Sequence, residues 1–197
     1  MDEQGSLRER LVDAGVELVL AEGSGAVGLR EIARRAGVSH GAPRRYFATH
    51  QALLSAVARR GFEELAGRFE AAVAGAAGPR EKVAAFARVY VAFAGERRGM
   101  FELMFRHDLL NGDGVAEGQP RLREATRPLF GEMARLVGEC LGEPARAGVV
   151  TAALWTNLHG LAQLWGWGSV QLMLGEQARV DALLDAVLDA HLGPVAA

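Results

Sequence analysis

Two adjacent arginines, Arg44 and Arg45, stand near the end of the stretch GVSHGAPRRYF, residues 37–47. A guanidinium can donate two parallel hydrogen bonds to guanine O6 and N7, or it can bind a phosphate. His40 and Tyr46, in the same stretch, can donate hydrogen bonds to phosphate oxygens. The small residues Gly41 and Ala42 would let the backbone approach a ligand closely. The chemistry of this stretch is therefore suited to contact with DNA.

The arginines belong to a local excess of positive charge. The formal net charge of the 197-residue chain is −2, yet residues 26–60 contain seven arginines and one acid and so carry +6. A basic patch on an otherwise acidic protein is an electrostatic footprint that suits a polyanion. Charge alone leaves open the alternative of a solvated helix face.

The surrounding elements would present this stretch on a surface. The capping-box spacing of Ser6 and Glu9 predicts a first helix over residues 6–22, and apolar periodicity predicts a short second helix over residues 29–36. Gly37 would turn the chain, and Ser39 would cap a third short helix that ends at residue 46 or 47. Two short helices joined by such a turn form a helix-turn-helix. The apolar residues expected to pack between the two helices are Ile32, Ala33, Ala36, Val38 and Pro43.

The segment from Leu7 to Leu54 resembles the N-terminal DNA-binding domain of the tetracycline-repressor (TetR) family. The resemblance rests on LREIARRAGVS, on the pair Tyr46-Phe47 and on the following ALL. It implies a helix-turn-helix domain over residues 1–48 and an effector-binding and dimerisation domain over residues 49–197. It also implies a homodimer, a double-stranded DNA operator with an inverted repeat, and a small-molecule effector. Repression is the expected mode, because the family mostly represses.

Four positions depart from the common family pattern. Arg44 replaces a phosphate-binding tyrosine, Pro43 a leucine, His50 a lysine and Gly28 a capping threonine or serine. We expect Tyr46 and His50 to contact phosphates, His40 and Arg45 to contact bases, and Arg44 to do either. The complete set of expected DNA-binding residues is Gly28, Ser39, His40, Gly41, Ala42, Arg44, Arg45, Tyr46 and His50.

The rest of the chain also has helical periodicity, without the alternation of a strand. A long helix is predicted over residues 49–74, and the next helix opens at Pro79 with an apolar stripe that reaches Phe93. Further helices are predicted over 100–110, 121–141, 144–168 and 175–191, and the loop NGDGVAEGQP spans 111–120. We expect this loop to be the most mobile segment. The fold class is therefore all-α, with about nine helices.

A dense stretch in the second half begins LWTNLHG at residue 154. Its two apolar stripes predict a helix that is buried on two sides, one of them facing a second subunit. The W-x-x-x-H-G run resembles the C-terminal regulatory domain of a subset of the TetR family. An alternative is that both stripes form intramolecular core. The expected dimer-interface residues are Ala152, Ala153, Gly160, Leu161, Trp165, Val180, Leu184 and Val187.

Aromatic and methionine side chains predict an effector pocket among the middle helices. Its expected residues are Phe86, Tyr90, Phe93, Phe101, Met104, Phe105, Trp155 and His159. Any one of them, His159 in particular, can instead be a satisfied core residue. The group favours an apolar or aromatic effector of limited polarity. Effector binding would shift the two subunits between arrangements that do or do not match successive major grooves.

The sequence lacks the residue patterns of an enzyme, a metal site or a membrane protein. Cys140 has no histidine near it in sequence, and Arg106-His107-Asp108 has no second histidine at ligand spacing, so we expect no enzyme, no metal and no cofactor. With no long apolar run and an acidic N-terminus, the expected location is the cytoplasm, with no membrane partner. The remaining alternative is a helical ligand-binding or adaptor protein without specific operator recognition.

Overall fold

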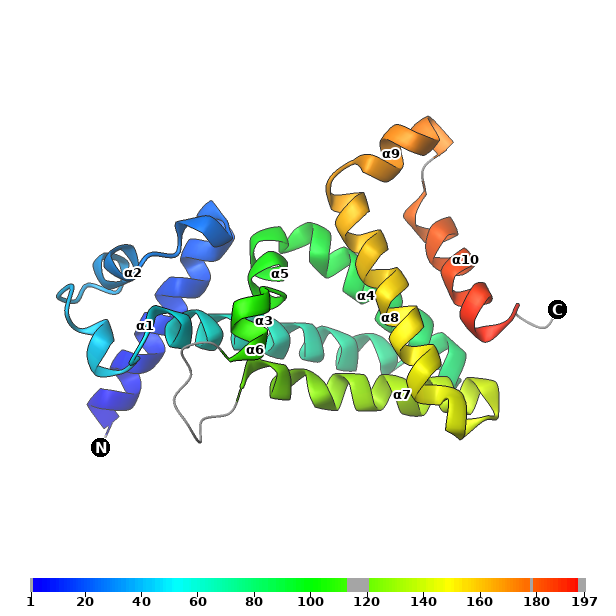
Figure 1. Cartoon of the computed structure of the whole chain (residues 1–197), viewed down its shortest axis with the longest axis horizontal. Helices are drawn as coiled ribbons and strands as arrows, with labels where there is room; N and C mark the ends of the chain where they lie inside the picture. Colours follow the sequence, from blue (N-terminus) through cyan, green and yellow to red (C-terminus); the bar gives the residue numbers. More distant parts are fainter. Residues whose placement is uncertain (1, 113–120, 178, 195–197) are drawn as a thin grey trace. The chain divides into compact units, whose positions relative to one another are not determined.

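The computed structural model describes residues 2–112, 121–177 and 179–194, and in these ranges it contains ten α-helices and no strand (Figure 1). The predicted all-α class is confirmed. The chain forms two compact units, one of residues 1–64 and 97–126 and the other of residues 65–96 and 127–197. The predicted loop at 111–120 lies mostly outside the described residues.

The first unit begins with α1 (Asp2–Glu22), which buries one apolar stripe and starts earlier than the predicted residue 6. No proline precedes Ser6, so nothing in the sequence stops the helix there. Gly15 lets α1 approach α3 (His50–Val73), because a Cβ at this position would lie 2.5 Å from Cγ2 of Val57. A 3-10 turn, η1 (Ser24–Ala26), then leads to α2 (Leu29–Arg35).

The end of α2 is fixed by a Schellman motif. The N–H groups of Gly37 and Val38 donate to the carbonyls of Arg34 and Ala33, and Gly37 has a φ of +68°. Arg10 of α1 donates from Nη2 to the carbonyl oxygen of Ala36 at 2.6 Å. The predicted turn at Gly37 is therefore present.

The predicted third helix is wrong as an α-helix. The structure has only a 3-10 turn, η2 (Pro43–Arg45), in which Arg45 N–H donates to the Ala42 carbonyl and Tyr46 N–H to the Pro43 carbonyl. Pro43 has no N–H to donate, and Gly41 disfavours a regular helix, so i to i+3 bonds predominate. One bond of α-helical type, from the Phe47 N–H to the Pro43 carbonyl at 2.9 Å, ends the turn.

Helix α3 begins after Thr49, whose Oγ1 accepts from the N–H of Ala52 at 3.0 Å. In the first unit it packs on α5 (Arg98–Met104) at Gly61, where a Cβ would lie 2.5 Å from Sδ of Met104 and 2.7 Å from Cγ of Met100. The helix predicted over 100–110 is divided. Arg106 is extended and separates α5 from α6 (His107–Asn111).

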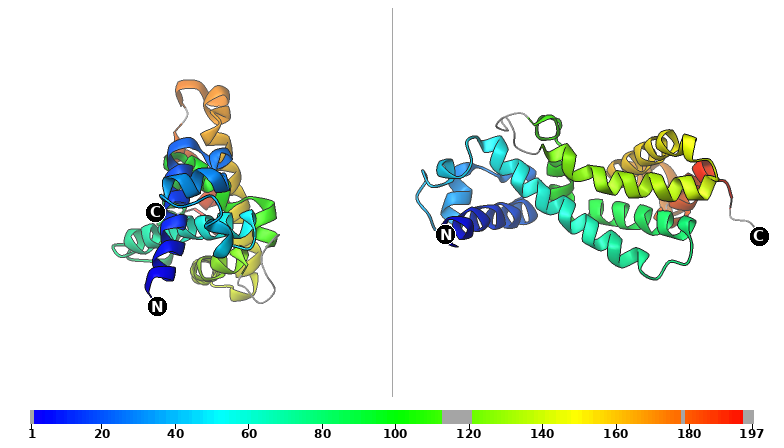
Figure 2. Two further views of the ribbon diagram at one scale, coloured as in Figure 1. Left: turned by 90° about the vertical axis from the view of Figure 1, so that its left-hand side faces the viewer. Right: turned by 90° about the horizontal axis from the view of Figure 1, so that it is seen from below.

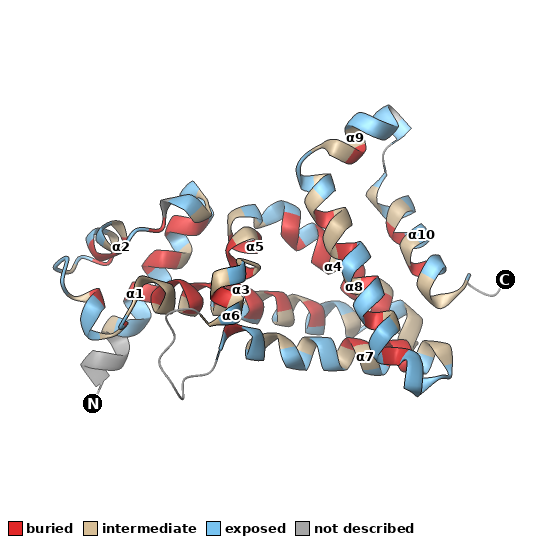
Figure 3. Cartoon of the chain, in the orientation of Figure 1, coloured by how far each residue is buried: buried red, intermediate tan, exposed pale blue. Residues whose placement is uncertain are grey.

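The second unit contains α4 (Pro79–Glu96), α7 (Arg127–Leu141), α8 (Pro144–Gly166), α9 (Ser169–Leu174) and α10 (Val180–Leu192). Helix α8 packs against α4, α7 and α10, and α4 lies beside α7 (Figure 2). Helix α8 has one buried side, which is seen along the ribbon in Figure 3. Its buried residues are Ala147, Thr151, Leu154, Leu158 and Ala162.

Two helices begin later than the sequence predicts. A 3-10 turn, η3 (Leu122–Thr126), occupies the start of the helix predicted over 121–141. The last helix begins at Val180 rather than Gly175, because Gly175 has a φ of +58° and belongs to the turn η4 (Gly175–Gln177).

Among the described residues, no helix combines the length and the apolar character that crossing a membrane requires.

Candidate DNA interface and effector site

The helix-turn-helix buries the apolar residues that the sequence predicts. Ile32, Ala33, Ala36 and Pro43 are buried, and Val38 is half-buried. The side chains left at the surface between them are the expected DNA contacts. Ser39, His40, Gly41, Arg44 and Arg45 are exposed, while Ala42 and Tyr46 are half-buried.

Several arginines of residues 26–60 pair with acids, which leaves fewer of them available for contact with DNA. Arg34 pairs with Glu31, and Arg35 with Glu22 at 3.1 Å. Arg60 lies 3.7 Å from Asp13 and 3.6 Å from Glu63. Arg44 and Arg45 make no ion pair or side-chain hydrogen bond within the described parts of the chain. These two guanidiniums therefore keep their full hydrogen-bonding capacity for a ligand.

His50 lies where α3 begins and reaches back to the start of α2. Its Nε2 donates to the carbonyl oxygen of Val27 at 2.6 Å, and Gly28, the N-cap of α2, is the next residue. The structure thus brings together Gly28 and His50, two of the expected DNA-binding residues, of which the sequence assigns His50 to a phosphate contact. With Nε2 engaged, a phosphate contact would use Nδ1, which becomes a donor when the ring is protonated.

In the second unit, three polar groups from α4 and α8 form a chain of hydrogen bonds. Trp155 Nε1 donates to the Tyr90 hydroxyl at 3.2 Å, and that hydroxyl lies 2.8 Å from Nδ1 of His159. Tyr90 is 2% exposed, whereas Trp155 and His159 are half-buried. Burial raises the pKa of Tyr90 and lowers the pKa of His159, so both groups are neutral near pH 7.

Further rings extend this chain into an aromatic cluster. Phe86 stacks on Tyr90 at 6.0 Å between centroids, and Phe69 of α3 meets Phe86 edge to face at 4.8 Å. Phe69 is not among the effector residues expected from the sequence. Phe93 is fully buried, and the guanidinium of Arg68 lies 5.2 Å from its ring centroid.

The predicted effector residues divide between the two units. Tyr90, Trp155 and His159 meet in the second unit, where Phe86 and Phe93 also lie. Phe101, Met104 and Phe105 belong to the first unit, where the rings of Phe101 and Phe105 are 4.9 Å apart. A single pocket formed by all eight residues stays a prediction.

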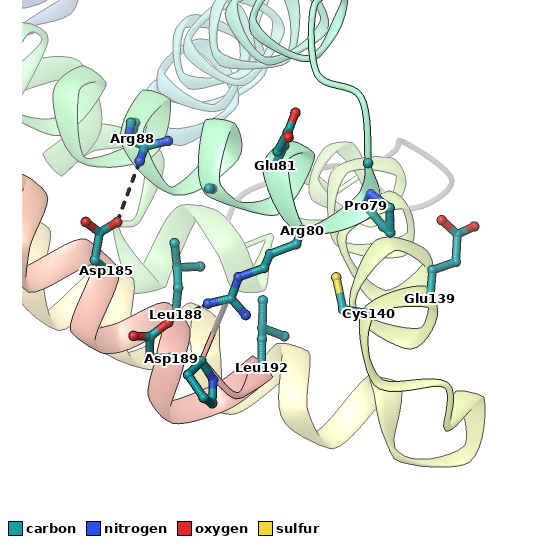
Figure 4. Close-up of a pocket in the computed structure, with 13 residues that line it drawn as sticks. Pro79, Arg80, Glu81, Arg88, Glu139, Cys140, Asp185, Leu188, Asp189 and Leu192 are labelled. Carbon is teal, nitrogen blue, oxygen red and sulfur yellow. Dashed lines mark hydrogen bonds and ion pairs between the residues drawn. The ribbon is translucent and has the colours of Figure 1, made fainter. Parts of the chain in front are cut away.

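An open groove of about 1030 Å³ lies elsewhere in the second unit, between α4, α7 and α10 (Figure 4). Arg80 reaches across it and donates to the Gly193 carbonyl at 2.6 Å and to Asp189 at 2.5 Å. Arg88 pairs with Asp185 at 3.6 Å. These contacts hold α10 on α4 and were missed in the sequence, since the partners are about a hundred residues apart.

The expected dimer-interface residues have unequal exposure. Ala152 and Ala153 are exposed, and these five are half-buried: Gly160, Leu161, Trp165, Val180 and Val187. Leu184 is 2% exposed, so it is core of its own unit and leaves almost no surface for a partner. Trp167, Leu172 and Met173, which the sequence reading left out, are 61%, 90% and 77% exposed.

The surroundings of the residues considered for catalysis or metal binding are as follows. Arg106 donates to both carboxylate oxygens of Asp108 at 3.1 and 2.6 Å, which lowers the pKa of Asp108. Burial raises the pKa of the Cys140 thiol, which makes it a weaker nucleophile. In the described ranges, no three His, Cys, Asp or Glu side chains are placed to hold a metal ion.

Comparison with known families decides the identity. Residues 11–57 match the model of bacterial regulatory proteins of the tetR family, and residues 83–191, more than half of the chain, match the tetracyclin repressor-like C-terminal domain. The chain belongs to the TetR family. Its predicted family is therefore confirmed, whereas the W-x-x-x-H-G subset stays a prediction.

Curated relatives match this TetR-family chain over part of their length. The HTH-type transcriptional regulator BetI of Rhizobium meliloti is 42% identical over 82 residues, which cover 42% of this chain and 40% of that protein. BetI of Agrobacterium fabrum is 38% identical over 90 residues, or 46% and 43% of the two chains. The match thus spans less than half of each relative.

Solved structures match the TetR-family chain over nearly its full length. A protein of unknown function from Rhodococcus sp. RHA1 is 31% identical with a TM-score of 0.76, over 97% of this chain and 96% of that one. The putative regulatory protein SCO4313 is 23% identical with a TM-score of 0.66, over 97% of each chain, which shows a shared fold.

Proposed function

We propose that the protein is a ligand-responsive, DNA-binding transcriptional regulator that acts as a repressor and is released from its operator by a small apolar or aromatic effector. The observation that carries the proposal is the pair of exposed guanidiniums at Arg44 and Arg45, which have no side-chain partner among the described residues, on the helix-turn-helix of a TetR-family chain. We further propose that it works as a homodimer on an inverted repeat, in the cytoplasm, and has no catalytic activity.

Some arginines of the basic segment are paired with acids and others are not, and this difference supports specific rather than general DNA binding. Arg34 and Arg35 are paired with acids of the same unit, so they add little to attraction for a polyanion. Arg44 and Arg45 lie beside residues that pack the turn against α2, which fixes their backbone. A guanidinium on a fixed backbone can select a guanine by its two acceptors.

The effector side of the proposal rests on the α4–α8 contact in the second unit. An aromatic cluster with a few hydrogen-bonding groups is the composition of a small-molecule site. Trp155 and His159 are half-buried, so the cluster reaches accessible surface. The exposed and half-buried apolar side chains of α8 and α10 support the homodimer.

The competing function is a helical ligand-binding or adaptor protein without operator recognition. It is favoured by η2, because this 3-10 turn replaces the α-helix that would ordinarily enter a major groove.

Retardation of DNA from upstream of the protein's own gene, with an excess of unrelated duplex as competitor, separates the two functions. The regulator predicts a retarded band that survives competition and disappears when an inverted repeat in the fragment is scrambled. Binding that any duplex removes, and that moderate salt abolishes, would leave only a generic basic patch.

A further inference from the structure

Two arginines of α1 contact the two ends of the recognition stretch, residues 37–47. Nη2 of Arg10 donates to the carbonyl oxygen of Ala36, directly before the stretch, at 2.6 Å. Cζ of Arg8 lies 5.1 Å from the ring centroid of Phe47, the last residue of the stretch. One helix therefore holds the recognition stretch at its beginning and at its end.

The spacing of the two arginines explains how one helix reaches both ends. Residues two apart in an α-helix are about 200° apart around its axis, so Arg8 and Arg10 leave α1 on opposite flanks. Between these flanks lies the buried stripe of α1, in which Leu11 and Leu18 are fully buried, and α1 packs on α2. The two side chains thus extend to either side of the contact between α1 and the helix-turn-helix.

The contact of Arg10 satisfies the end of a helix. Ala36 is the C-cap of α2, and the last carbonyls of a helix lack intrahelical partners and carry partial negative charge. The Schellman motif at Gly37 uses the carbonyls of Arg34 and Ala33, and Arg10 supplies a charged donor for the carbonyl of Ala36. Arg10 therefore fixes the point at which the chain leaves α2 and the recognition stretch begins.

The contact of Arg8 lies where the recognition stretch ends. Phe47 is 5% exposed, and its N–H donates to the Pro43 carbonyl at 2.9 Å. A guanidinium over an aromatic face is attracted by the charge distribution of the ring. Because the N–H of Phe47 closes η2, holding this residue also holds the turn that carries Arg44 and Arg45.

We propose that Arg8 and Arg10 are positioning residues for operator recognition, which hold the recognition stretch on α1 and so set the direction in which Arg44 and Arg45 face DNA. The inference rests on the proposed function and adds two residues of α1 to it. Because both side chains are exposed and cationic, the competing role is direct contact with phosphate. A positioning residue affects the discrimination between sequences, whereas a phosphate contact contributes equally to every duplex.

Binding of full-length variants to the operator and to a random duplex of the same length, followed by fluorescence anisotropy over a series of salt concentrations, separates the two roles. We expect Arg10→Ala to weaken operator binding about tenfold, the effect of one lost charge-assisted hydrogen bond, and random-duplex binding by less than about twofold. The slope of log affinity against log salt concentration should stay the same. Equal losses on both duplexes with a slope shallower by about one would make Arg10 a phosphate contact and overturn the proposal, as would an unchanged operator affinity.

A second variant and a control belong to the same titrations. Arg8→Ala removes the contact with the Phe47 ring and should weaken operator binding about threefold, again with little change on the random duplex. Arg146→Ala removes a positive charge at the start of α8 in the second unit and should leave both affinities unchanged. Helical circular dichroism shows whether each variant is folded. A loss of the same size on both duplexes would remove Arg8 from the positioning role.

Amide hydrogen exchange in the free protein gives a readout that does not depend on DNA. Exchange should become faster by about threefold or more at the Val38 N–H in Arg10→Ala and at the Phe47 N–H in Arg8→Ala, and should not change in α8. Phosphate contacts would leave exchange in the free protein unchanged, and that result would overturn the proposal. If Arg10→Ala does not fold, Arg8→Ala still supplies both readouts.

The wild-type protein separates this inference from the proposed function. Equal affinity of the wild type for the operator and the random duplex defeats the proposed function alone, because the exchange measurement still tests the contacts of α1. Specific wild-type binding, with unchanged discrimination and unchanged exchange in both variants, defeats the inference alone.

Discussion

Arg45 is exposed at the last position of η2 and has no partner within the described residues, so its guanidinium can face a base edge. We expect Arg45→Ala to weaken binding to the operator by about 1–3 kcal/mol and binding to random DNA by much less. Fluorescence anisotropy with both duplexes at one salt concentration measures the difference. Arg146→Ala removes the same charge from the surface of the second unit and should change neither affinity. An equal loss on both duplexes would make Arg45 a backbone contact.

His159 should make the second unit less stable in mild acid. Burial lowers its pKa below the usual 6.5, so between the two values the unfolded chain binds more protons than the folded chain. Its contribution to the free energy of unfolding is complete above about pH 6.5 and is lost as the pH falls through the folded pKa. Urea titrations from pH 7.5 to 5 should show a smaller fall for His159→Gln than for the wild type. The exposed His107→Gln should follow the wild type, and parallel curves for all three proteins would contradict the prediction.

Thr151 gives a prediction about stability. Its buried hydroxyl has no hydrogen-bond partner among the described residues, so replacing it by a methyl group in Thr151→Val should raise the free energy of unfolding by about 1–2 kcal/mol. Chemical denaturation measures the effect. A loss of stability would show that the hydroxyl is satisfied in the folded protein.

At the scale of elements, the contact of α3 with α5 depends on the absence of a side chain at Gly61. A methyl group there would meet Met100 and Met104 well inside van der Waals distance, so Gly61→Ala should destabilise the protein by about 1–3 kcal/mol. Gly67 lies on the same helix with nothing within 4 Å, and Gly67→Ala should be neutral or stabilise by up to about 1 kcal/mol. Thermal unfolding measures the difference in stability between the two variants. Equal stability of both variants would mean that Met100 and Met104 move aside and that the contact does not depend on Gly61.

The helices were largely predictable because their apolar periodicity is local, whereas their interruptions were not. The bounds of α2 and α3 and the start of α4 agree with the sequence to within about one residue. The extended backbone at Arg106 divides a predicted helix, and its guanidinium binds Asp108, two residues further on. Pro43 was correctly placed in the buried side of the turn, but its missing N–H also prevents the α-helix predicted around it.

At the scale of the whole molecule, the sequence predicted which side chains are exposed better than which side chains meet. The local pattern of residues 37–47 named the exposed arginines, since turn and helix periods decide what faces outward. It could not show that Tyr90 meets His159 and Trp155 across 65 to 69 residues, because such contacts depend on how helices pack. The same limit explains why Arg80 and its partners on α10 were missed.

The central claim is that effector and operator binding are coupled in one homodimer. Coupling requires that a ligand changes operator affinity, typically by 5- to 150-fold, and that the operator changes ligand affinity by the same factor. A labelled operator duplex bound to the full-length protein should be titrated with any compound that calorimetry shows to bind. The account predicts that the operator dissociation constant rises at least about fivefold at saturating ligand. An operator affinity that stays unchanged for every compound that binds would contradict it.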